Sequence, residues 1–189
     1  MGSLQQAGVT TEPMPITQKS TLEAKNALIQ HFRSTRSSIL EAAADLPVAS
    51  LNTPFVGSWG ILELLAHLRG WDLTNLQAAI DIPRGTLPAF YAEFDADWAS
   101  YNARLVAQNK LDELGPMIAS VVESQSELLR LLNQLSPQDV FGDHGVRRGR
   151  YKVTIDRLIQ AETEDEEKHL QQVRGFLSSL REGTHQISA

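Results

Sequence analysis

Apolar residues spaced three and four positions apart, in stretches of about 20 residues or more, constrain the fold of this chain more than any other feature. This spacing places the apolar side chains on one face of an α-helix. No segment alternates apolar and polar residues over any length, so only residues 150–153 are expected to pair briefly as strands. The sequence predicts helices from Thr17 or Ser20 to Leu46, from Ser58 to about Ile80, from Pro88 to about Lys110, from about Leu111 to Leu135, and from Thr154 to about Glu182.

Four long helices and one shorter helix favour an all-α fold, a four-helix bundle. The chain has 189 residues, which is enough for one domain with a substantial core and short for two. Residues 1–16 are rich in Gly, Thr, Pro and Gln without periodicity, so we expect a disordered N-terminal tail there. The predicted organisation is therefore a helical bundle over residues 17–182, followed by a C-terminal tail over residues 183–189.

Composition narrows the class of partners. The net charge of -6 argues against nucleic-acid binding, which needs a basic face. No apolar run approaches the roughly 20 residues of a membrane-spanning helix, so we expect no membrane partner. The chain has no cysteine, which excludes disulfides, thiolate metal ligands and a cysteine nucleophile and fits a cytoplasmic protein. The one basic cluster, residues 147–150, is either a solvated turn or a binding site for an anionic group.

The apolar face of the last predicted helix is interrupted for about two turns. Glu162, Glu166 and His169 fall inside that face, and Asp165 lies at its edge, one turn before His169. Burying a lone charge costs several kcal/mol unless the charge is paired or coordinated. The interruption therefore indicates a water-filled cleft or a bound cation, unless these residues form an ordinary solvated face. The residues that share the apolar face are Ile155, Leu158, Ile159, Val173, Phe176, Leu177 and Leu180.

A histidine stands in the second predicted helix, where its neighbours on the helix surface are apolar. His67 lies beside Leu64 and Trp71, so it is either a hydrogen-bonded core residue or a metal ligand. Two histidines and a carboxylate on two helices that a bundle can bring together form a known ligand set for a divalent ion. Glu166 and His169 have the spacing that di-iron bundles use, but the motif has no second copy in the chain, which argues against a dinuclear site.

Several segments resemble the DinB-like superfamily. The segment SWGILELLAHLRGWD (residues 58–72) is similar to that family's Trp followed by a helix with Leu-Leu-x-His-Leu-x-x-Trp. The last predicted helix resembles a Thr-capped helix with His-x-x-x-His, or with an acid in the first position. Residues 97–104 are similar to the Trp-x-x-Tyr/Phe-Asn segment of the DfsB branch, and residues 128–140 fit as well. The resemblance spans residues 17–181.

The resemblance implies a four-helix bundle with a long crossover connection and an additional shorter helix. It also implies a divalent-metal site, of the nickel or zinc type, at His67, Asp165 and His169. The chain departs from the family at Asp165, where His is commoner, and at Ala161, where many members have a further His. Because other members are often homodimers, a homodimer is expected here.

Two functions follow from this reading. The first is a metal-dependent hydrolase or thiol transferase that acts on a small reactive compound, with Glu162 or Glu166 as general base. Any thiol would come from outside, since the chain has no cysteine. The second is a non-catalytic ligand-binding or stress-related bundle whose polar pocket holds no metal. In that case the aromatic residues between positions 90 and 101 line a pocket for a small-molecule ligand, unless they are core or interface residues; Asn102 is a further pocket residue on resemblance alone.

Overall fold

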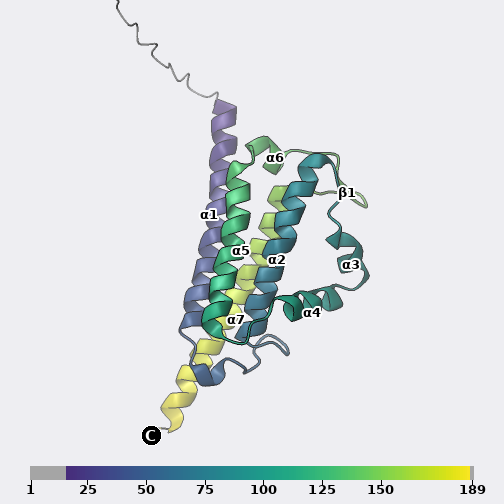
Figure 1. Ribbon diagram of the computed structural model, residues 1–189. Coiled ribbons are helices and arrows are strands. Elements are labelled where there is room, and N and C mark those ends of the chain that lie inside the picture. The colour runs from purple at the N-terminus through teal and green to yellow at the C-terminus, as the bar shows by residue number, and fades with distance from the viewer. Residues whose placement is uncertain (1–15, 188–189) are drawn as a thin grey trace, which may run out of the picture.

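Four long helices form the bundle in the computed structural model, which describes residues 16–187 and the side chains of residues 21–182 (Figure 1). They are α1 (Ile16–Ala44), α2 (Ile61–Asp81), α5 (Leu114–Gln134) and α7 (Ile155–Ile187). The predicted all-α four-helix bundle is therefore confirmed. The proposed N-terminal tail lies outside the described residues except for Ile16, and its disorder stays a prediction. Of the proposed C-terminal tail, residues 183–187 belong to α7, and residues 188–189 lie outside the described residues. None of the described helices combines the length and apolar character required to cross a membrane.

The order of the helices around the bundle explains the long crossover connection. Helix α1 packs against α7 and α5, and α2 packs against α5 and α7. Helices α2 and α5 run in the same direction, opposite to α1 and α7 (Figure 1). Between α2 and α5 the chain must therefore return along the bundle, and it does so through α3 (Phe90–Ala96) and α4 (Trp98–Asn109). Helix α4 packs against α2 and brings the crossover to one side of the bundle.

The apolar core is divided into two clusters by a polar layer. One cluster lies around Ile39, Leu64 and Val173, and the other lies around Phe32, Leu128 and Ile159. On each bundle helix, buried polar residues fall between the two clusters in sequence; Lys25 on α1 and His67 on α2 are buried polar residues outside this interval. The layer comprises Arg36 on α1, Asp72 and Asn75 on α2, Ser124 and Gln125 on α5, and Glu162 and Glu166 on α7.

The prediction of a single third helix is wrong. Residues 88–110 form two helices, because Asp97 adopts an extended backbone conformation with φ -158° and ψ 93°. Its side chain accepts hydrogen bonds from the backbone N–H groups of Ala99 and Ser100, both at 3.1 Å, and so caps α4. The crossover therefore turns at Asp97, and the axes of α3 and α4 run in different directions (Figure 1).

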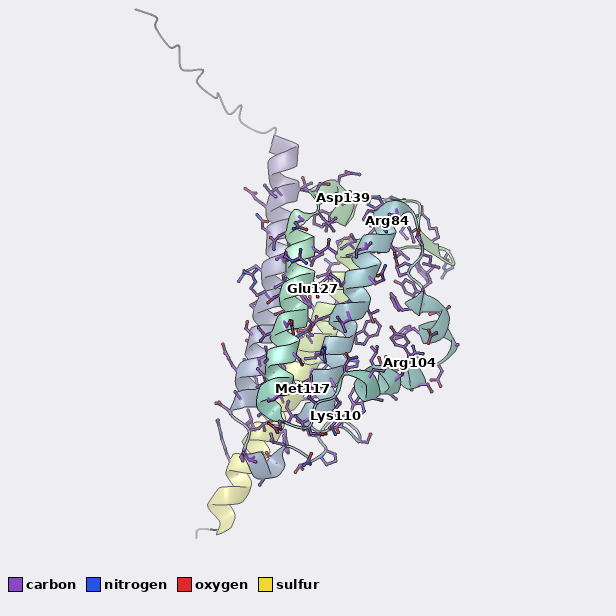
Figure 2. All side chains as sticks on the ribbon, in the orientation of Figure 1. Arg84, Arg104, Lys110, Met117, Glu127 and Asp139 are labelled. Carbon is purple, nitrogen blue, oxygen red and sulfur yellow. The ribbon has the colours of Figure 1, made fainter. Side chains whose placement is uncertain are left out.

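Other boundaries differ in smaller ways. Helix α2 begins at Ile61 rather than after Ser58, because the Glu63 side chain accepts a hydrogen bond from the Gly60 N–H at 3.0 Å. Glu63 also pairs with Lys110. Lys110 stands at the end of α4, where the chain turns toward α5 (Figure 2). Helix α5 begins at Leu114 rather than Leu111, and α7 continues past the predicted end near Glu182. A short helix, α6 (Pro137–Phe141), follows the predicted stop at Ser136 because Ser136 caps it.

The expected brief strand pairing is present as a two-residue hairpin. Strands β1 (Arg147–Arg148) and β2 (Tyr151–Lys152) are antiparallel, with Arg148 opposite Tyr151. Gly149 begins the turn with a φ of 58°, a left-handed conformation that glycine adopts without strain. Two single-turn 3-10 helices, η1 (Val48–Ser50) and η2 (Ile82–Arg84), complete the connections. The hairpin places the basic cluster next to α3, just before α7 begins.

Candidate metal centre

Helices α2 and α7 run in opposite directions and bring the two predicted histidine ligands together. The ring centroids of His67 and His169 are 5.4 Å apart, and the rings are inclined at 82°. Their exposed fractions are only 4% and 8%. Asp165 lies one turn before His169 on α7 and is half exposed. One ligand atom from each of the three residues lies within 4.8 Å of the others, so the predicted set converges on one point.

The distances among these ligand atoms fit a single ion. Asp165 Oδ2 lies 3.2 Å from His169 Nε2 and 3.9 Å from His67 Nε2. Two donor atoms that each lie about 2.1 Å from one ion are roughly 3 Å apart at a right angle and about 4.2 Å apart on opposite sides of it. Both carboxylate–imidazole distances fall in that span. The residues therefore fit a mononuclear centre with three protein ligands.

One ring nitrogen of each candidate histidine has no hydrogen-bond partner in the described part of the chain. His169 Nδ1 lies 2.8 Å from Gln172 Oε1, and because an amide oxygen only accepts, Nδ1 carries the proton. His169 Nε2 is buried and has no hydrogen-bond partner among residues 16–187, so its lone pair is available to an ion. His67 Nδ1 is buried and equally unpartnered in the described part of the chain. Gln172 thus orients the His169 ring through a hydrogen bond to its other nitrogen, whereas no described residue makes the equivalent hydrogen bond to His67 Nδ1.

The electrostatics of the three residues favour the forms that bind a metal. Burial lowers the pKa of His67, and the nearby Asp165 carboxylate offsets this shift only in part. Hydrogen bonds from His169 and His67, when these imidazoles carry a proton toward the carboxylate, hold the pKa of Asp165 well below its ordinary range. A neutral imidazole and an ionised carboxylate are the ligand forms of these groups. At neutral pH neither His67 nor Asp165 has to release a proton before an ion binds.

The polar layer beside these residues is a buried ion cluster. Arg36 donates to both oxygens of Asp72 at 2.8 and 3.1 Å, and also to both oxygens of Glu166. Ser124 Oγ donates to Asp72 at 2.7 Å. Burial alone would lower the pKa of Arg36, but Asp72 and Glu166 raise it above its ordinary value. This cluster explains the charge of Glu166 on an apolar face, and it corrects the prediction that Glu166 could serve as general base, because both its oxygens are engaged.

Glu162 is a buried carboxyl beside the candidate ligands that does not pair with Arg36. It lies one turn before Glu166 on α7, is 8% exposed and accepts a hydrogen bond of 3.3 Å from Asn75 Nδ2. Burial and then the neighbouring Glu166 raise the pKa of Glu162 well above its ordinary value. Glu162 therefore keeps its proton at a pH where an exposed glutamate has lost it. In that state it is a proton donor rather than the base expected from the sequence.

A cavity of about 760 Å³ opens over the candidate ligands, and His67, Asp165, His169 and Glu162 all line it. Its opposite wall comes from the crossover and from the loop before α2, whose aromatic residues face the bundle. Trp71 Nε1 donates to Asn102 Oδ1 at 3.1 Å, which holds α2 and α4 at a fixed spacing behind the wall. The aromatic residues that line the cavity are Trp59, Trp71, Phe90, Tyr91, Phe94 and Trp98.

Most of the predicted pocket residues are therefore at the cavity. Phe90, Tyr91, Phe94 and Trp98 line it, as does Asn102, whereas Tyr101 is buried against α2 and lies 3.0 Å from the Thr74 hydroxyl. The other described histidines lie elsewhere: His31 pairs with Glu167 on an exposed face, and His144 bonds to the backbone of α6.

The sequence reading missed Arg36, Asp72 and Asn75. A signal existed for Arg36, since it falls between Phe32 and Ile39 on the buried face of α1, as Glu166 does on α7. Nothing in the spacing of Asp72 or Asn75 marks them, because α2 is buried on most of its surface and its polar residues show no separate face.

The fold and the site define a helical-bundle protein with a candidate three-ligand metal centre at the base of an aromatic cavity. The sequence profile of the DinB superfamily matches residues 31–173, so the chain belongs to that superfamily, as the resemblance implied. Among solved structures, an uncharacterised protein from Escherichia coli UTI89 has a TM-score of 0.66 at 14% identity, covering 83% of this chain and 94% of that one. At this identity the likeness shows the fold alone. A comparison with curated proteins finds no significant match.

Proposed function

We propose that the protein is a DinB-superfamily metalloenzyme of the DfsB type that acts on a small reactive compound in the aromatic cavity. His67, Asp165 and His169 would hold a divalent ion of the nickel or zinc type. The observation that carries the proposal is the convergence of their ligand atoms to within 4.8 Å, together with the buried His169 Nε2, which has no hydrogen-bond partner in the described structure. When bound, such an ion supplies Lewis acidity, which favours attack on a substrate by water or by a small-molecule thiol.

The residues around the cavity would bind the substrate and donate a proton. The aromatic wall binds the apolar part of the substrate and excludes water, which strengthens the electrostatic interactions at the base of the cavity. Glu162 holds a proton that it can give to a leaving group. Its carboxyl is kept in place by Asn75, and the adjacent ion cluster of Arg36 fixes the helix turn on which it stands.

The volume of the cavity supports a small-molecule substrate. About 760 Å³ is within the range of ligand sites for drug-sized molecules, and it leaves room for a second small reactant such as a thiol. Hydrolysis and thiol transfer are both compatible with this space. A thermal-shift screen of the metal-loaded protein with small thiols separates them, because a thiol that binds the native state raises the apparent stability. No shift with any thiol would count against thiol transfer.

Elemental analysis of the purified protein tests the metal centre itself. Protein dialysed against a chelator and then supplied with Ni²⁺ or Zn²⁺ should take up one ion per chain and melt at a higher temperature. His67→Ala and His169→Ala should each abolish the uptake. His31→Ala is the matched control, since that imidazole is 59% exposed and lies outside the cavity.

Equal uptake by the wild type and by both cavity variants would show that the proposed ligand set is wrong. A non-catalytic ligand-binding function would then be the better explanation of the aromatic cavity. A homodimer and a cytoplasmic location remain predictions from the sequence, and gel filtration with light scattering tests the first of these.

A further inference from the structure

Arg148 is the member of the basic cluster that reaches the cavity. Its neighbours point to other partners: Arg147 pairs with Asp143 at 2.7 Å, and Arg150 stacks on Tyr151. The Arg148 guanidinium carbon lies 4.8 Å from the ring centroid of Tyr91 and 5.9 Å from that of Phe94. The turn residues 149–150 and the short strands hold this side chain against the aromatic wall. A basic group is thus built into the lining of a mainly apolar cavity.

The guanidinium of Arg148 keeps one edge unused. Asp95 accepts a hydrogen bond from Nε at 2.9 Å and a second from Nη2. No partner of Nη1 is found within residues 16–187. The edge formed by Nη1 and the second N–H of Nη2 therefore offers two parallel donors, which is the geometry that a carboxylate accepts. Asp95 fixes the orientation of the group without occupying this edge.

Arg148 lies toward the end of the cavity that is farther from the candidate metal ligands. Along α7 the lining residues run from Leu158 to His169, which is about 16 Å at 1.5 Å per residue. The hairpin that carries Arg148 immediately precedes α7, whereas His169 lies well down that helix. Aromatic side chains from α2 and α3 line the space in between. A ligand that reaches both ends must be elongated and apolar in its middle.

We infer that the cavity binds an elongated apolar or aromatic carboxylate, with its carboxylate on the free edge of Arg148 and its other end at His67 and His169. The inference deepens the proposed function by naming the substrate class, and it rests on that function only for what happens at the histidine end. Binding of the carboxylate end requires no metal. The two proposals can therefore fail independently.

The chain carries its own reporter for this cavity. It has three tryptophans, Trp59, Trp71 and Trp98, and all of them line the cavity. Tryptophan fluorescence should therefore change when a ligand enters. Suitable probes are 3-phenylpropanoate and its neutral amide, 3-phenylpropanamide, which share the apolar body and differ in the charge of the end group. Titrations are made with a chelator present and again after loading with Zn²⁺.

With the chelator present, the carboxylate should bind the wild-type protein about tenfold more tightly than the amide, since its two hydrogen bonds are charge-assisted. Arg148→Gln should abolish this preference, while Arg147→Gln and Arg150→Gln retain it. Asp95→Asn should increase it, because the guanidinium then loses its competing carboxylate. A purely structural Arg148–Asp95 pair predicts no gain in Asp95→Asn, so this variant separates ligand recognition from folding.

Three results would overturn the inference. The first is no fluorescence response to either probe. The second is tighter binding of the matching ammonium compound, 3-phenylpropylammonium, than of the carboxylate. The third is a carboxylate preference that appears only with Zn²⁺ and survives Arg148→Gln, because the carboxylate would then bind the ion. That last result would contradict the role of Arg148 but not the proposed metal centre. Conversely, if metal-free His67→Ala still prefers the carboxylate to the amide, the inference is supported even if the metal centre is wrong.

Discussion

Arg36 and Glu166 are joined by two hydrogen bonds, Nε to Oε2 at 3.0 Å and Nη2 to Oε1 at 2.5 Å, and neither side chain is exposed. The pair links α1 to α7 at the level where the two apolar clusters separate. Asp72 on α2 binds the same guanidinium, so one cation holds three helices of the bundle. The candidate centre at His169 lies one turn along α7 from Glu166. The geometry of the centre therefore depends on this layer.

Breaking the layer at its cation should be strongly destabilising. In Arg36→Met the carboxylates of Asp72 and Glu166 lose their shared partner inside the core, so we expect a loss of about 3–5 kcal/mol in the free energy of unfolding. Urea denaturation monitored by circular dichroism measures it. Arg33→Met on the exposed side of α1 should change the free energy by less than about 0.5 kcal/mol.

A second variant separates the loss of the ion pair from the loss of packing. In Arg36→Met combined with Asp72→Leu and Glu166→Leu, no charge is left unpaired, and the stability should return to near the wild-type value. If this triple variant is as unstable as Arg36→Met, shape rather than charge explains the effect.

The fold could be predicted from the sequence because the apolar spacing that indicates a helix is a local property of the chain. Periodic apolar residues predicted the four bundle helices, but they did not reveal where a side chain caps a helix from an unexpected position. Asp97 is such a case, since an Asp inside an apolar-periodic stretch looks like a surface residue until the chain turns there. Glu63 is another, because it acts from inside the helix whose start it fixes.

The candidate site was predictable only in part. The interruption on α7 marked Asp165 and His169 as unusual, the apolar surroundings of His67 marked a third candidate, and the resemblance supported the three as a ligand set. The same interruption did not distinguish Glu166, which serves the ion cluster, from Glu162, which faces the cavity. Their roles depend on Arg36 and Asn75, which lie on other helices, and the pairing of helices is not a local property of the sequence. The hairpin that brings Arg148 to the cavity has the same non-local origin.

Glu162 should make the stability of the metal-free protein fall as pH rises. Its pKa is raised by burial above the value of 4.5 that describes the unfolded chain, so the folded protein binds the proton more tightly. Between those two pKa values the folded state holds more protons, and unfolding becomes easier as pH increases. Glu162→Gln mimics the protonated carboxyl and should lessen this fall between about pH 5 and pH 8, so the variant gains stability relative to the wild type toward the upper end.

Urea midpoints with a chelator present, measured across that range, provide the test. Glu164→Gln is the matched control, because Glu164 is exposed on the same helix and its replacement should leave the slope unchanged. A wild-type slope in Glu162→Gln would mean that Glu162 is ionised in the folded protein and is not a proton donor.

Gly70 allows α2 and α4 to approach closely behind the aromatic wall. A Cβ at this position would lie 2.8 Å from Leu105 Cβ and 3.3 Å from Asn109 Nδ2. Gly70→Ala should therefore cost about 1–3 kcal/mol by overpacking. Gly175→Ala is the contrasting variant, because Gly175 is an exposed helical position where a Cβ meets nothing within 4 Å. It should gain about 0.5–1 kcal/mol, and a gain in both variants would show that α4 can move away from α2 without cost.

Gln172 should tune the metal affinity without being a ligand. Its Oε1 lies 2.8 Å from His169 Nδ1 and so fixes the tautomer that directs Nε2 toward Asp165. Gln172→Ala should weaken Zn²⁺ binding by roughly tenfold to a hundredfold while the stoichiometry remains one ion per chain. Competition with a chromophoric chelator measures the affinity, and Gln171→Ala, an exposed neighbour, should leave it unchanged. An unchanged affinity in Gln172→Ala would mean that His169 is oriented by packing alone. A variant that no longer binds one ion per chain would mean that Gln172 itself coordinates the ion.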